Sequence, residues 1–282
     1  MDLTMPPQQD IESAVARALA EDIGSGDLTA QLIPAAQAAQ ATVISRVDAV
    51  LCGSAWFSAC FRQLDPAVEI VWHARDGDLV SPNQLLCTLR GRARALLTAE
   101  RTGLNFLQTL SGTASTVRQY VNAIIGTKAR ILDTRKTLPG LRLAQKYAVR
   151  TGGGSNHRIG LFDGVLIKEN HIVAAGGIGP ALDQARAIAP PGVPVQVEVE
   201  SLLELAEALQ HGAKLILLDN FSLDQLRAAV KLNAGQAQLE ASGNVSLATV
   251  RAIAETGVDR ISIGSLTKDL QAIDLSMRFQ PE

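Results

Sequence analysis

Residues 193–219, VPVQVEVESLLELAEALQHGAKLILLD, place two β-rich runs on either side of one helical stretch. In the first run the side chains alternate between two faces, so the valines can pack against helices while Gln196, Glu198 and Glu200 face the opposite side. The second run is apolar up to its final aspartate, Asp219. Two such runs joined by a helix predict parallel strands connected by a right-handed crossover.

The same alternation of a β-rich run and a helical stretch continues from residue 129 to residue 264. The runs are ARILDT (129–134), DGVLIK (163–168), VPVQVEVE (193–200), KLILLD (214–219), AQLEAS (237–242) and VDRISIG (258–264). Helical periodicity between them is clearest at residues 202–210, 223–231 and 247–255. This repetition predicts a β/α barrel slightly smaller than the eight-stranded form, with the three polar side chains of residues 193–200 pointing inward. A doubly wound open sheet is the alternative architecture.

The part of the chain before residue 129 has a different texture. Its short elements are predicted as helices at Ile11–Glu21 and Ser54–Phe61, and as strands at Ala41–Leu51, Val68–Trp72 and Gln84–Leu89. This order favours an α+β domain with a mostly antiparallel sheet. An apolar stripe then predicts a helix over residues 92–125, broken near Ser111-Gly112. We place the domain boundary at this break, with residues 1–112 in the first domain and residues 113–265 in the barrel.

The composition is that of a compact globular protein. Of 282 residues, 47% are hydrophobic and 19% are charged, and the formal net charge of -2 gives no long-range attraction to nucleic acid or to an anionic membrane. The first ten residues lack the features of a secretory signal, and no run of about 18 apolar residues follows, so we expect a cytoplasmic protein. Three cysteines, an odd number without close pairs, are expected to be reduced packing residues.

Charged residues, polar residues or glycines end nearly every β-rich run. They are Asp133, Thr134, Arg135 and Lys136 in the first, Lys168, Glu169 and Asn170 in the second, Glu198 and Glu200 in the third, Asp219 and Asn220 in the fourth, Ser242, Gly243 and Asn244 in the fifth, and Gly264 and Ser265 in the sixth. Carboxyl ends of parallel strands meet at one mouth of a barrel, where active sites of this fold are built. The sequence therefore predicts a single cleft that holds these residues.

Positive charges are frequent in the predicted cleft. Lys168 ends an apolar strand, so its ammonium must pair with a carboxylate such as Glu198 or Asp219, or meet an anionic ligand. The glycines of TGGGSNHRIG (151–160) let backbone N–H groups approach an anion, while His157 and Arg158 add positive charge. Together with the Arg-Lys pair that follows the first run, these residues predict a pocket for a ligand with several negative charges.

Acidic and phosphate-binding positions complete the cleft. Glu198 is expected to contact a metal ion or the substrate, whereas Glu200 either joins it or only neutralises a neighbouring cation. The segments SGN (242–244) and SIGSLT (262–267) place backbone donors and hydroxyls at helix N-termini, the first of them near Ser246. This arrangement favours a phosphate site, with plain helix capping as the alternative explanation.

Seven segments, taken together, resemble one known family: EDIGSGDLTA (21–30), TAERTGLNFLQTLSGTAS (98–115), ILDTRKTLPGLRLAQKYAVRTGGGSNHRIGLFDGVLIKENHI (131–172), VEVES (197–201), LLDNF (217–221), EASGNV (240–245) and ISIGSLT (261–267). The chain resembles the quinolinate phosphoribosyltransferases over essentially its whole length. That resemblance implies an N-terminal α+β sandwich domain, an incomplete β/α barrel, and a return of residues 266–282 to the first domain. It also implies a homodimer in which each barrel mouth is closed by the partner's N-terminal domain.

The resemblance assigns a role to each candidate residue. It implies that quinolinate and phosphoribosyl pyrophosphate react to give nicotinate mononucleotide, pyrophosphate and carbon dioxide, with Mg²⁺ as the cofactor. The implied catalytic residues are Lys136, Lys168, Glu198 and Asp219, of which Glu198 and Asp219 would bind the ribose hydroxyls or the magnesium ion. The implied substrate-binding residues are these four together with Arg101, which would reach the partner's site, and Thr134, Arg135, His157, Arg158, Ser242, Gly243, Asn244, Ile263, Gly264 and Ser265.

Two other functions remain open from the sequence. A strand-end lysine in a β/α barrel suits a Schiff-base aldolase when its pKa is lowered, and Lys168 occupies such a position. Some relatives of the family accompany molybdate transport systems, which leaves open an accessory or binding role in place of synthesis of nicotinate mononucleotide. Borohydride trapping would reveal the first, and turnover of quinolinate separates the biosynthetic enzyme from the second.

Overall fold

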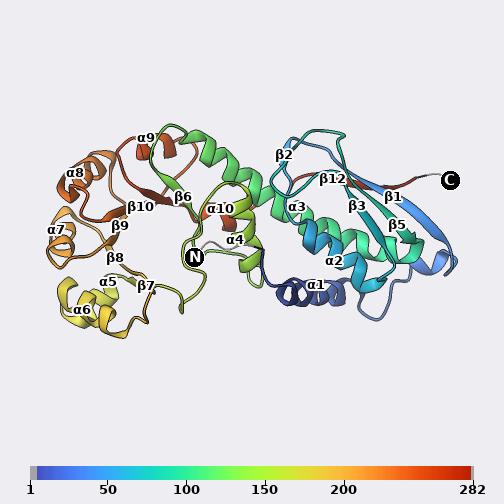
Figure 1. Ribbon diagram of the computed structural model, residues 1–282, viewed down its shortest axis with the longest axis horizontal. Coiled ribbons are helices and arrows are strands. Elements are labelled where there is room, and N and C mark those ends of the chain that lie inside the picture. Colours follow the sequence, from blue (N-terminus) through green and yellow to red (C-terminus); the bar gives the residue numbers. More distant parts are fainter. Residues whose placement is uncertain (1–4, 281–282) are drawn as a thin grey trace. The chain divides into compact units, whose positions relative to one another are not determined.

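The computed structural model describes residues 5–280, which group into two compact units (Figure 1). The first unit contains the described residues up to Arg118, the segment Thr137–Gly153 and the stretch from Leu266 onward. The second contains Gln119–Lys136 and Gly154–Ser265. The domain boundary expected between residues 112 and 113 stays a prediction.

The first unit is built on a four-stranded antiparallel sheet in the order β12-β1-β5-β3. Its strands are β1 (Ala38–Ser45), β3 (Glu69–Trp72), β5 (Leu85–Arg92) and β12 (Leu275–Phe279), and β2 (Ala49–Val50) pairs separately with β4 (Leu79–Val80). Its helical elements are α1 (Gln8–Ile23), η1 (Ala30–Leu32), α2 (Ser54–Leu64), α4 (Arg142–Thr151) and most of α3 (Ala93–Ala123), whose last residues belong to the second unit. The predicted α+β fold of this region is confirmed.

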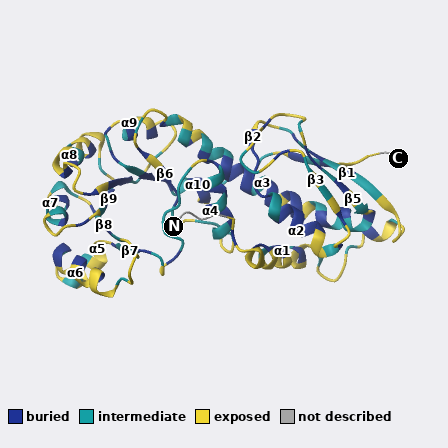
Figure 2. Ribbon diagram, viewed as in Figure 1, coloured by how far each residue is buried: buried dark blue, intermediate teal, exposed yellow. Residues whose placement is uncertain are grey.

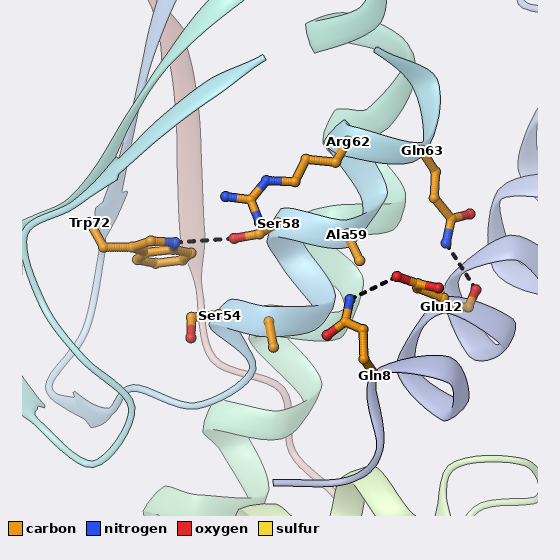
Figure 3. A pocket seen from close by; sticks show the side chains of 9 residues that line it. Gln8, Glu12, Ser54, Ser58, Ala59, Arg62, Gln63 and Trp72 are labelled. Atoms are coloured by element: carbon orange, nitrogen blue, oxygen red, sulfur yellow. Dashed lines mark hydrogen bonds between the residues drawn. The ribbon is translucent and has the colours of Figure 1, made fainter. Parts of the chain in front are cut away.

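Aromatic side chains of α2 fill the core beneath this sheet. Trp56, Phe57 and Phe61 are all buried, and the Phe57 ring lies 4.7 Å from Phe61 and 5.4 Å from Trp72 between ring centroids. The indole Nε1 of Trp72 donates a hydrogen bond to Ser58 Oγ at 3.1 Å (Figure 3). The hollow beside this contact has a volume of about 300 Å³ and is lined by residues of α1, α2 and β3. Hydrogen bonds among the residues that line the hollow hold α1, α2 and β3 together.

Helix α3 runs without interruption through Ser111-Gly112, so the predicted break at this point is wrong. Ser111 is fully buried, and its hydroxyl accepts from the Cys52 N–H at 2.9 Å and donates to the Cys52 carbonyl at 3.1 Å. A Cβ at Gly112 would overlap the carbonyl oxygen of Gln271 and lie 3.2 Å from the Cα of Ala272. Both residues therefore let another segment approach the helix closely. Small residues used for packing in this way look like a helix break when only the sequence is considered.

The second unit contains a six-stranded parallel sheet in the order β6-β11-β10-β9-β8-β7. The strands are β6 (Arg130–Leu132), β7 (Val165–Ile167), β8 (Val195–Val199), β9 (Leu215–Asp219), β10 (Gln238–Ser242) and β11 (Arg260–Ser262). Every predicted β-rich run of this region forms a strand. Figure 2 shows these strands largely buried and the helices outside them carrying much of the exposed surface.

The sheet curls as a barrel but remains open between β6 and β7, where no ladder joins the two strands within residues 5–280. At this seam Ser155 forms an isolated parallel bridge with Leu132. The Ser155 N–H donates to the Ile131 carbonyl at 2.8 Å, and the Asp133 N–H donates to the Ser155 carbonyl at 3.2 Å. One turn of the glycine-rich segment thus partly occupies the place of a missing strand, and the predicted incomplete barrel is confirmed.

The helices between the strands are α5 (Glu169–Ala175), α6 (Ile178–Ile188), α7 (Leu202–Gln210), α8 (Leu223–Asn233), α9 (Val250–Ala254) and α10 (Ser265–Lys268). Ser201 caps α7 by accepting from the Glu204 N–H at 3.2 Å, which explains why this helix has its predicted bounds. The helix predicted from near Ser246 instead begins at Val250. Thr249 Oγ1 accepts from the Ser246 N–H at 3.0 Å, so a hydrogen-bonded turn precedes the helix.

The three cysteines are free and buried, which confirms their predicted packing role. Among the described residues no helix has the length and apolar character needed to cross a membrane. The cytoplasmic location stays a prediction.

Gly112→Ala tests the close approach to α3. Replacing glycine by alanine in a helix interior usually stabilises it by about 1 kcal/mol. Here the added methyl group meets the backbone at Gln271-Ala272, so we expect the free energy of unfolding to fall by about 1–3 kcal/mol. Urea denaturation measures it, with Gln119→Ala at an exposed site of the same helix as the control, expected to change it by less than about 0.5 kcal/mol. A stabilised Gly112→Ala variant would contradict the packing described above.

Candidate functional site

The candidate residues of the second unit lie at the carboxyl ends of its parallel strands or in the segments that follow them. Thr134, Arg135 and Lys136 follow β6, Lys168 follows β7, Glu198 lies in β8, Asp219 and Ser242 end β9 and β10, and Ile263, Gly264 and Ser265 follow β11. His157 and Arg158 belong to the glycine-rich segment 151–160, which we call the seam segment because its Ser155 bridges to β6 at the open seam. Because the strands are parallel, these ends share one edge of the sheet, as the sequence predicts.

Lys168 and Glu198 form an ion pair across the ends of β7 and β8. The Lys168 Nζ lies 2.8 Å from Glu198 Oε2 and 3.1 Å from Oε1, so the ammonium bridges both carboxylate oxygens. The lysine side chain is about half exposed, whereas that of Glu198 is 12% exposed. The pairing proposed from the sequence is therefore present, and the lysine keeps an accessible face that can meet an anion.

Asp219, Asn220 and the turn after β10 form a second group. Asn220 Nδ2 donates to Asp219 Oδ2 at 2.8 Å, and the Asn220 N–H donates to the Ser242 carbonyl at 2.9 Å. A Cβ at Gly243, which has a φ of 100°, would overlap the Asn220 Oδ1. Only glycine fits this backbone and this contact. Asn220, which the sequence places at a strand end without a role, thus orients the Asp219 carboxylate and fixes the glycine turn beside it.

Lys136 lies over Gly264 at the ends of β6 and β11. A Cβ built on Gly264 would be 2.8 Å from the Lys136 Cδ, 3.7 Å from its Nζ and 3.6 Å from Thr134 Oγ1. Thr134 Oγ1 also accepts from the Lys136 N–H at 3.0 Å, which shapes the turn that carries the lysine. The absence of a side chain at Gly264 leaves room for the stem of Lys136 to cross it.

Arg135 and Arg158 bring two positive charges near each other. Burial, and then the charge of Arg135, lower the pKa of the Arg158 guanidinium, and Asp163 opposes this shift. The Arg158 Nη1 donates to the Gly164 carbonyl at 2.9 Å. Asp163 accepts from the N–H groups of Ile159 and Gly160 at 2.8 and 2.9 Å, which closes the turn after the arginine. An anion bound between the guanidinium groups would offset their repulsion.

Negative charge collects around the ends of β8 and β9. The pKa of Glu200 is raised, first by the charge of Glu169, then by desolvation and by a hydrogen bond with Glu169, and further by Glu204 and Asp219. Glu200 is exposed just beyond β8, so it does not share the interior position predicted for it together with Gln196 and Glu198. The strand ends therefore have a positive part, formed by the cations after β6, by Lys168 and by the seam segment, and a negative part, formed by the carboxylates at β8 and β9 together with Glu169.

No group of three or more His, Cys, Asp or Glu side chains within the described part of the chain is arranged to hold a metal ion by itself. Mg²⁺ needs fewer protein ligands, because it keeps several waters and binds through one or two carboxylates and the phosphates of a substrate. Glu198 and Asp219 supply such carboxylates, and the raised pKa of Glu200 records the local excess of negative charge that a cation would offset. These residues fit a magnesium ion that is bound together with a phosphorylated substrate.

Asp133 holds the seam segment itself. The sequence places this residue at the end of the first β-rich run but does not indicate a role for it. This carboxylate is fully buried and accepts from Asn156 Nδ2 at 2.6 Å and from the His157 N–H at 2.8 Å. A charged side chain directly after two apolar strand residues is the signal that could have identified it. Arg101, by contrast, belongs to the first unit, where it is exposed on α3.

Comparison with known proteins identifies the family. The model of the quinolinate phosphoribosyl transferase C-terminal domain matches residues 113–278, and that of the N-terminal domain matches residues 27–111. This chain belongs to the quinolinate phosphoribosyltransferase family. The predicted resemblance is thereby confirmed over both parts of the chain.

Individual members of the quinolinate phosphoribosyltransferase family are similar along nearly their whole length. A probable nicotinate-nucleotide pyrophosphorylase (carboxylating) of Bacillus subtilis is 42% identical over 257 residues, covering 91% of this chain and 89% of the relative. The structure of the nicotinate-nucleotide pyrophosphorylase from Francisella tularensis matches with a TM-score of 0.96 and 46% identity, covering 99% of both chains. The corresponding structure from Ehrlichia chaffeensis gives a TM-score of 0.90 and 38% identity, covering 95% of this chain and 98% of that one.

Gly264→Ala tests the contact between Gly264 and Lys136. The added methyl group displaces the lysine stem, so we expect kcat/KM for phosphoribosyl transfer to fall about tenfold or more, the effect of losing a hydrogen bond from a charged group. In a Lys136→Ala background the same change has no lysine to displace and should have little further effect. Steady-state kinetics of the two single variants and the double variant measure this coupling. Strictly multiplicative losses would show that Gly264 acts independently of Lys136.

Proposed function

We propose that this chain transfers the phosphoribosyl group of phosphoribosyl pyrophosphate to quinolinate, giving nicotinate mononucleotide, pyrophosphate and carbon dioxide. The observation that carries the proposal is the division of the strand ends into a positive and a negative part, in a chain of this family. Two strongly anionic substrates need the first part. A ribose carbon that becomes electron-poor needs the second.

The positive part suits the anionic groups of both substrates. A dicarboxylate and a phosphoribosyl pyrophosphate repel each other, so cations must offset their charges before they can react. Arg135 and Arg158 present planar guanidinium groups that suit carboxylates in a bidentate manner, and Lys136 and Lys168 suit the pyrophosphate. The backbone around Gly243 and Asn244, and the segment Ile263–Ser265, would hold the 5-phosphate through N–H groups and hydroxyls.

The negative part suits the transition state of transfer. As the bond between ribose C1 and the pyrophosphate oxygen breaks, its electron pair leaves with pyrophosphate and C1 gains positive character. Asp219, held by Asn220, and Glu198, held by Lys168, are the carboxylates that would stabilise this charge and accept hydrogen bonds from the ribose hydroxyls. The pyridine nitrogen of quinolinate then forms the new bond to C1.

Loss of carbon dioxide follows without an organic cofactor. Once the ring nitrogen is quaternary, it can stabilise the electron pair left on C2 when the bond from C2 to its carboxylate breaks. A proton from solvent then replaces the carboxylate at C2. The site contributes by desolvating that carboxylate. Magnesium, when bound, would neutralise charge on the departing pyrophosphate, with Glu198 and Asp219 as its protein ligands.

The geometry around Lys168 argues against the Schiff-base alternative. Its Nζ bridges both oxygens of Glu198, which is the arrangement of a charged ammonium donor rather than of a neutral amine in an apolar pocket. Several other cations surround the same cleft, as an anion-binding site requires. Borohydride trapping of a carbonyl compound on Lys168 would instead support the aldolase.

Purified protein should consume quinolinate only when phosphoribosyl pyrophosphate and Mg²⁺ are both present. Nicotinic acid, which lacks the second carboxylate, should react far more slowly, because the paired guanidinium groups lose one of their anionic partners. Release of pyrophosphate and of ¹⁴CO₂ from carboxyl-labelled quinolinate measures the reaction. Equal turnover of nicotinic acid, or no turnover of quinolinate, would contradict the proposal and favour an accessory role such as that of the transport-associated relatives.

We also propose a homodimer in which Arg101 reaches the partner's cleft. The family resemblance suggests this position, and the exposure of Arg101 on α3 leaves its guanidinium available for a partner. An exposed helix arginine paired with an acid on its own surface would be worth at most about 1 kcal/mol. A residue that completes a substrate site should have a much larger effect.

Mixing of variants tests the shared site. Arg101→Ala and Lys136→Ala should each lower kcat/KM by about 10- to 150-fold. After subunit exchange, half of the dimers are mixed and each has one site with both residues intact, so up to about a quarter of wild-type activity should return. The matched control is Lys136→Ala mixed with Lys168→Ala, which lie in the same chain's cleft and should restore nothing. Verified exchange without recovery in the first mixture would place Arg101 outside the partner's site.

A further inference from the structure

Three polar side chains form a hydrogen-bonded chain inside the second unit. Glu240 of β10 is 1% exposed, and its Oε2 accepts from Gln196 Nε2 at 3.1 Å. Gln196 of β8 is 4% exposed, and its Oε1 lies 2.9 Å from His157 Nε2. The side chains of Gln196 and Glu240 meet although β9 lies between their strands, so both point to the same face of the sheet. This series of hydrogen bonds ends at His157, in the segment that partly occupies the open seam.

The carboxylate of Glu240 sets the direction of each hydrogen bond in this series of three side chains. An ionised carboxylate only accepts, so Glu240 fixes Gln196 with its NH₂ toward β10 and its carbonyl oxygen toward His157. That oxygen requires a proton on His157 Nε2. The other ring nitrogen, Nδ1, accepts from the Arg158 N–H at 2.8 Å, which requires that Nδ1 carry no proton. The ring is thereby set as the neutral Nε2–H form.

This arrangement changes the role of His157. The sequence indicates that its ring adds positive charge to the pocket, whereas both ring nitrogens bond to protein groups in the structure. The ring links the buried carboxylate to the backbone of Arg158. Asp133 fixes the same segment from β6, through Asn156 and the His157 N–H.

Burying Glu240 is costly unless the charge performs a function. Its Oε1 accepts no hydrogen bond among residues 5–280 and lies 3.8 Å from His157 Nε2. A buried carboxylate with an unfilled acceptor is unfavourable, and an apolar side chain of similar size could fill the space at lower cost. What an apolar residue could not supply is the polarity that sets Gln196 and His157.

We propose that Glu240 is a positioning residue, which acts through Gln196 and His157 to hold Arg158 for the carboxylates of the dicarboxylate substrate. The inference rests on the proposed function for the identity of that substrate. Glu240 itself does not touch the substrate. Its loss should therefore affect the dicarboxylate and spare the phosphoribosyl pyrophosphate held at the other strand ends.

Glu240→Gln is the decisive variant because it keeps the shape and removes only the charge. If the new amide directs its oxygen to Gln196 Nε2, its NH₂ faces the Nε2–H of His157, donor against donor. If it is turned the other way, its NH₂ faces that of Gln196. The double variant Glu240→Gln/Gln196→Glu moves the carboxylate next to His157 and again pairs a donor with an acceptor at both wild-type contacts, so it should rescue the single variant.

Kinetics provide the first measurement. For Glu240→Gln we expect the KM for quinolinate to rise about tenfold or more, the effect of one misplaced charged hydrogen bond. The KM for phosphoribosyl pyrophosphate should stay within about twofold, because the other strand ends that hold this substrate are unchanged. Asp65→Asn, which neutralises a 2% exposed carboxylate paired with Arg92 in the first unit, is the matched control and should change neither KM. Equal rises in both KM values, or no rescue by the double variant, would overturn the proposal.

The nitrogen resonances of the histidine rings provide a second measurement that does not depend on activity. The chain has four histidines, so ¹⁵N-histidine labelling gives a simple spectrum in which His157 is identified by its loss in His157→Gln. We expect the Nε2–H form in the wild type, loss of that form in Glu240→Gln, and its return in the double variant. A wild-type Nδ1–H form would overturn the proposal even if Glu240→Gln does not fold. Failure of the wild type to use quinolinate would refute the proposed function and leave this spectrum to decide how His157 is set.

Discussion

The buried carboxylate of Asp133 is the constraint on which the candidate site depends. The parallel sheet of the second unit ends at β6 on one side and β7 on the other, and backbone pairing does not close it. Asp133 holds the intervening segment by hydrogen bonds to Asn156 and to the His157 backbone. This side chain thus adds to the short backbone bridge between Ser155 and Leu132, and it acts directly before Arg158 in the segment.

Leaving the barrel open has a chemical use. A regular strand at the seam would point alternate side chains to opposite faces and present its N–H groups to a neighbouring strand. The irregular segment instead turns the imidazole of His157 inward and leaves the guanidinium of Arg158 near that of Arg135. The charges around the strand ends are consequently divided: cations come from β6, β7 and the seam, and carboxylates from β8 and β9. This division suits a reaction between two anions in which positive charge develops on the ribose.

The sequence predicts the architecture well where periodicity is strong. All six β-rich runs form strands, and the helix at Leu202–Gln210 has its predicted bounds because Ser201 caps it. Prediction fails where a small residue serves packing instead of ending an element. Ser111 and Gly112 imitate a break, yet one bonds the Cys52 backbone and the other admits a crossing segment. The helix near Ser246 starts late because Thr249 closes a turn first. Pattern indicates the strand-end residues, but not which of them hold one another: Asn220, Asp133 and Glu240 acquire roles only through contacts between segments far apart in the chain.

The three buried cysteines have a practical consequence. Burial raises the pKa of each thiol, to about 12 for Cys60, so almost none is in the reactive thiolate form at neutral pH. Alkylating and fluorescent reagents will therefore find little to modify in the folded native chain. A single cysteine introduced at an exposed position becomes the one reactive handle, without removal of the native thiols from the core. The protein can in this way carry a single spectroscopic probe while its own packing stays untouched.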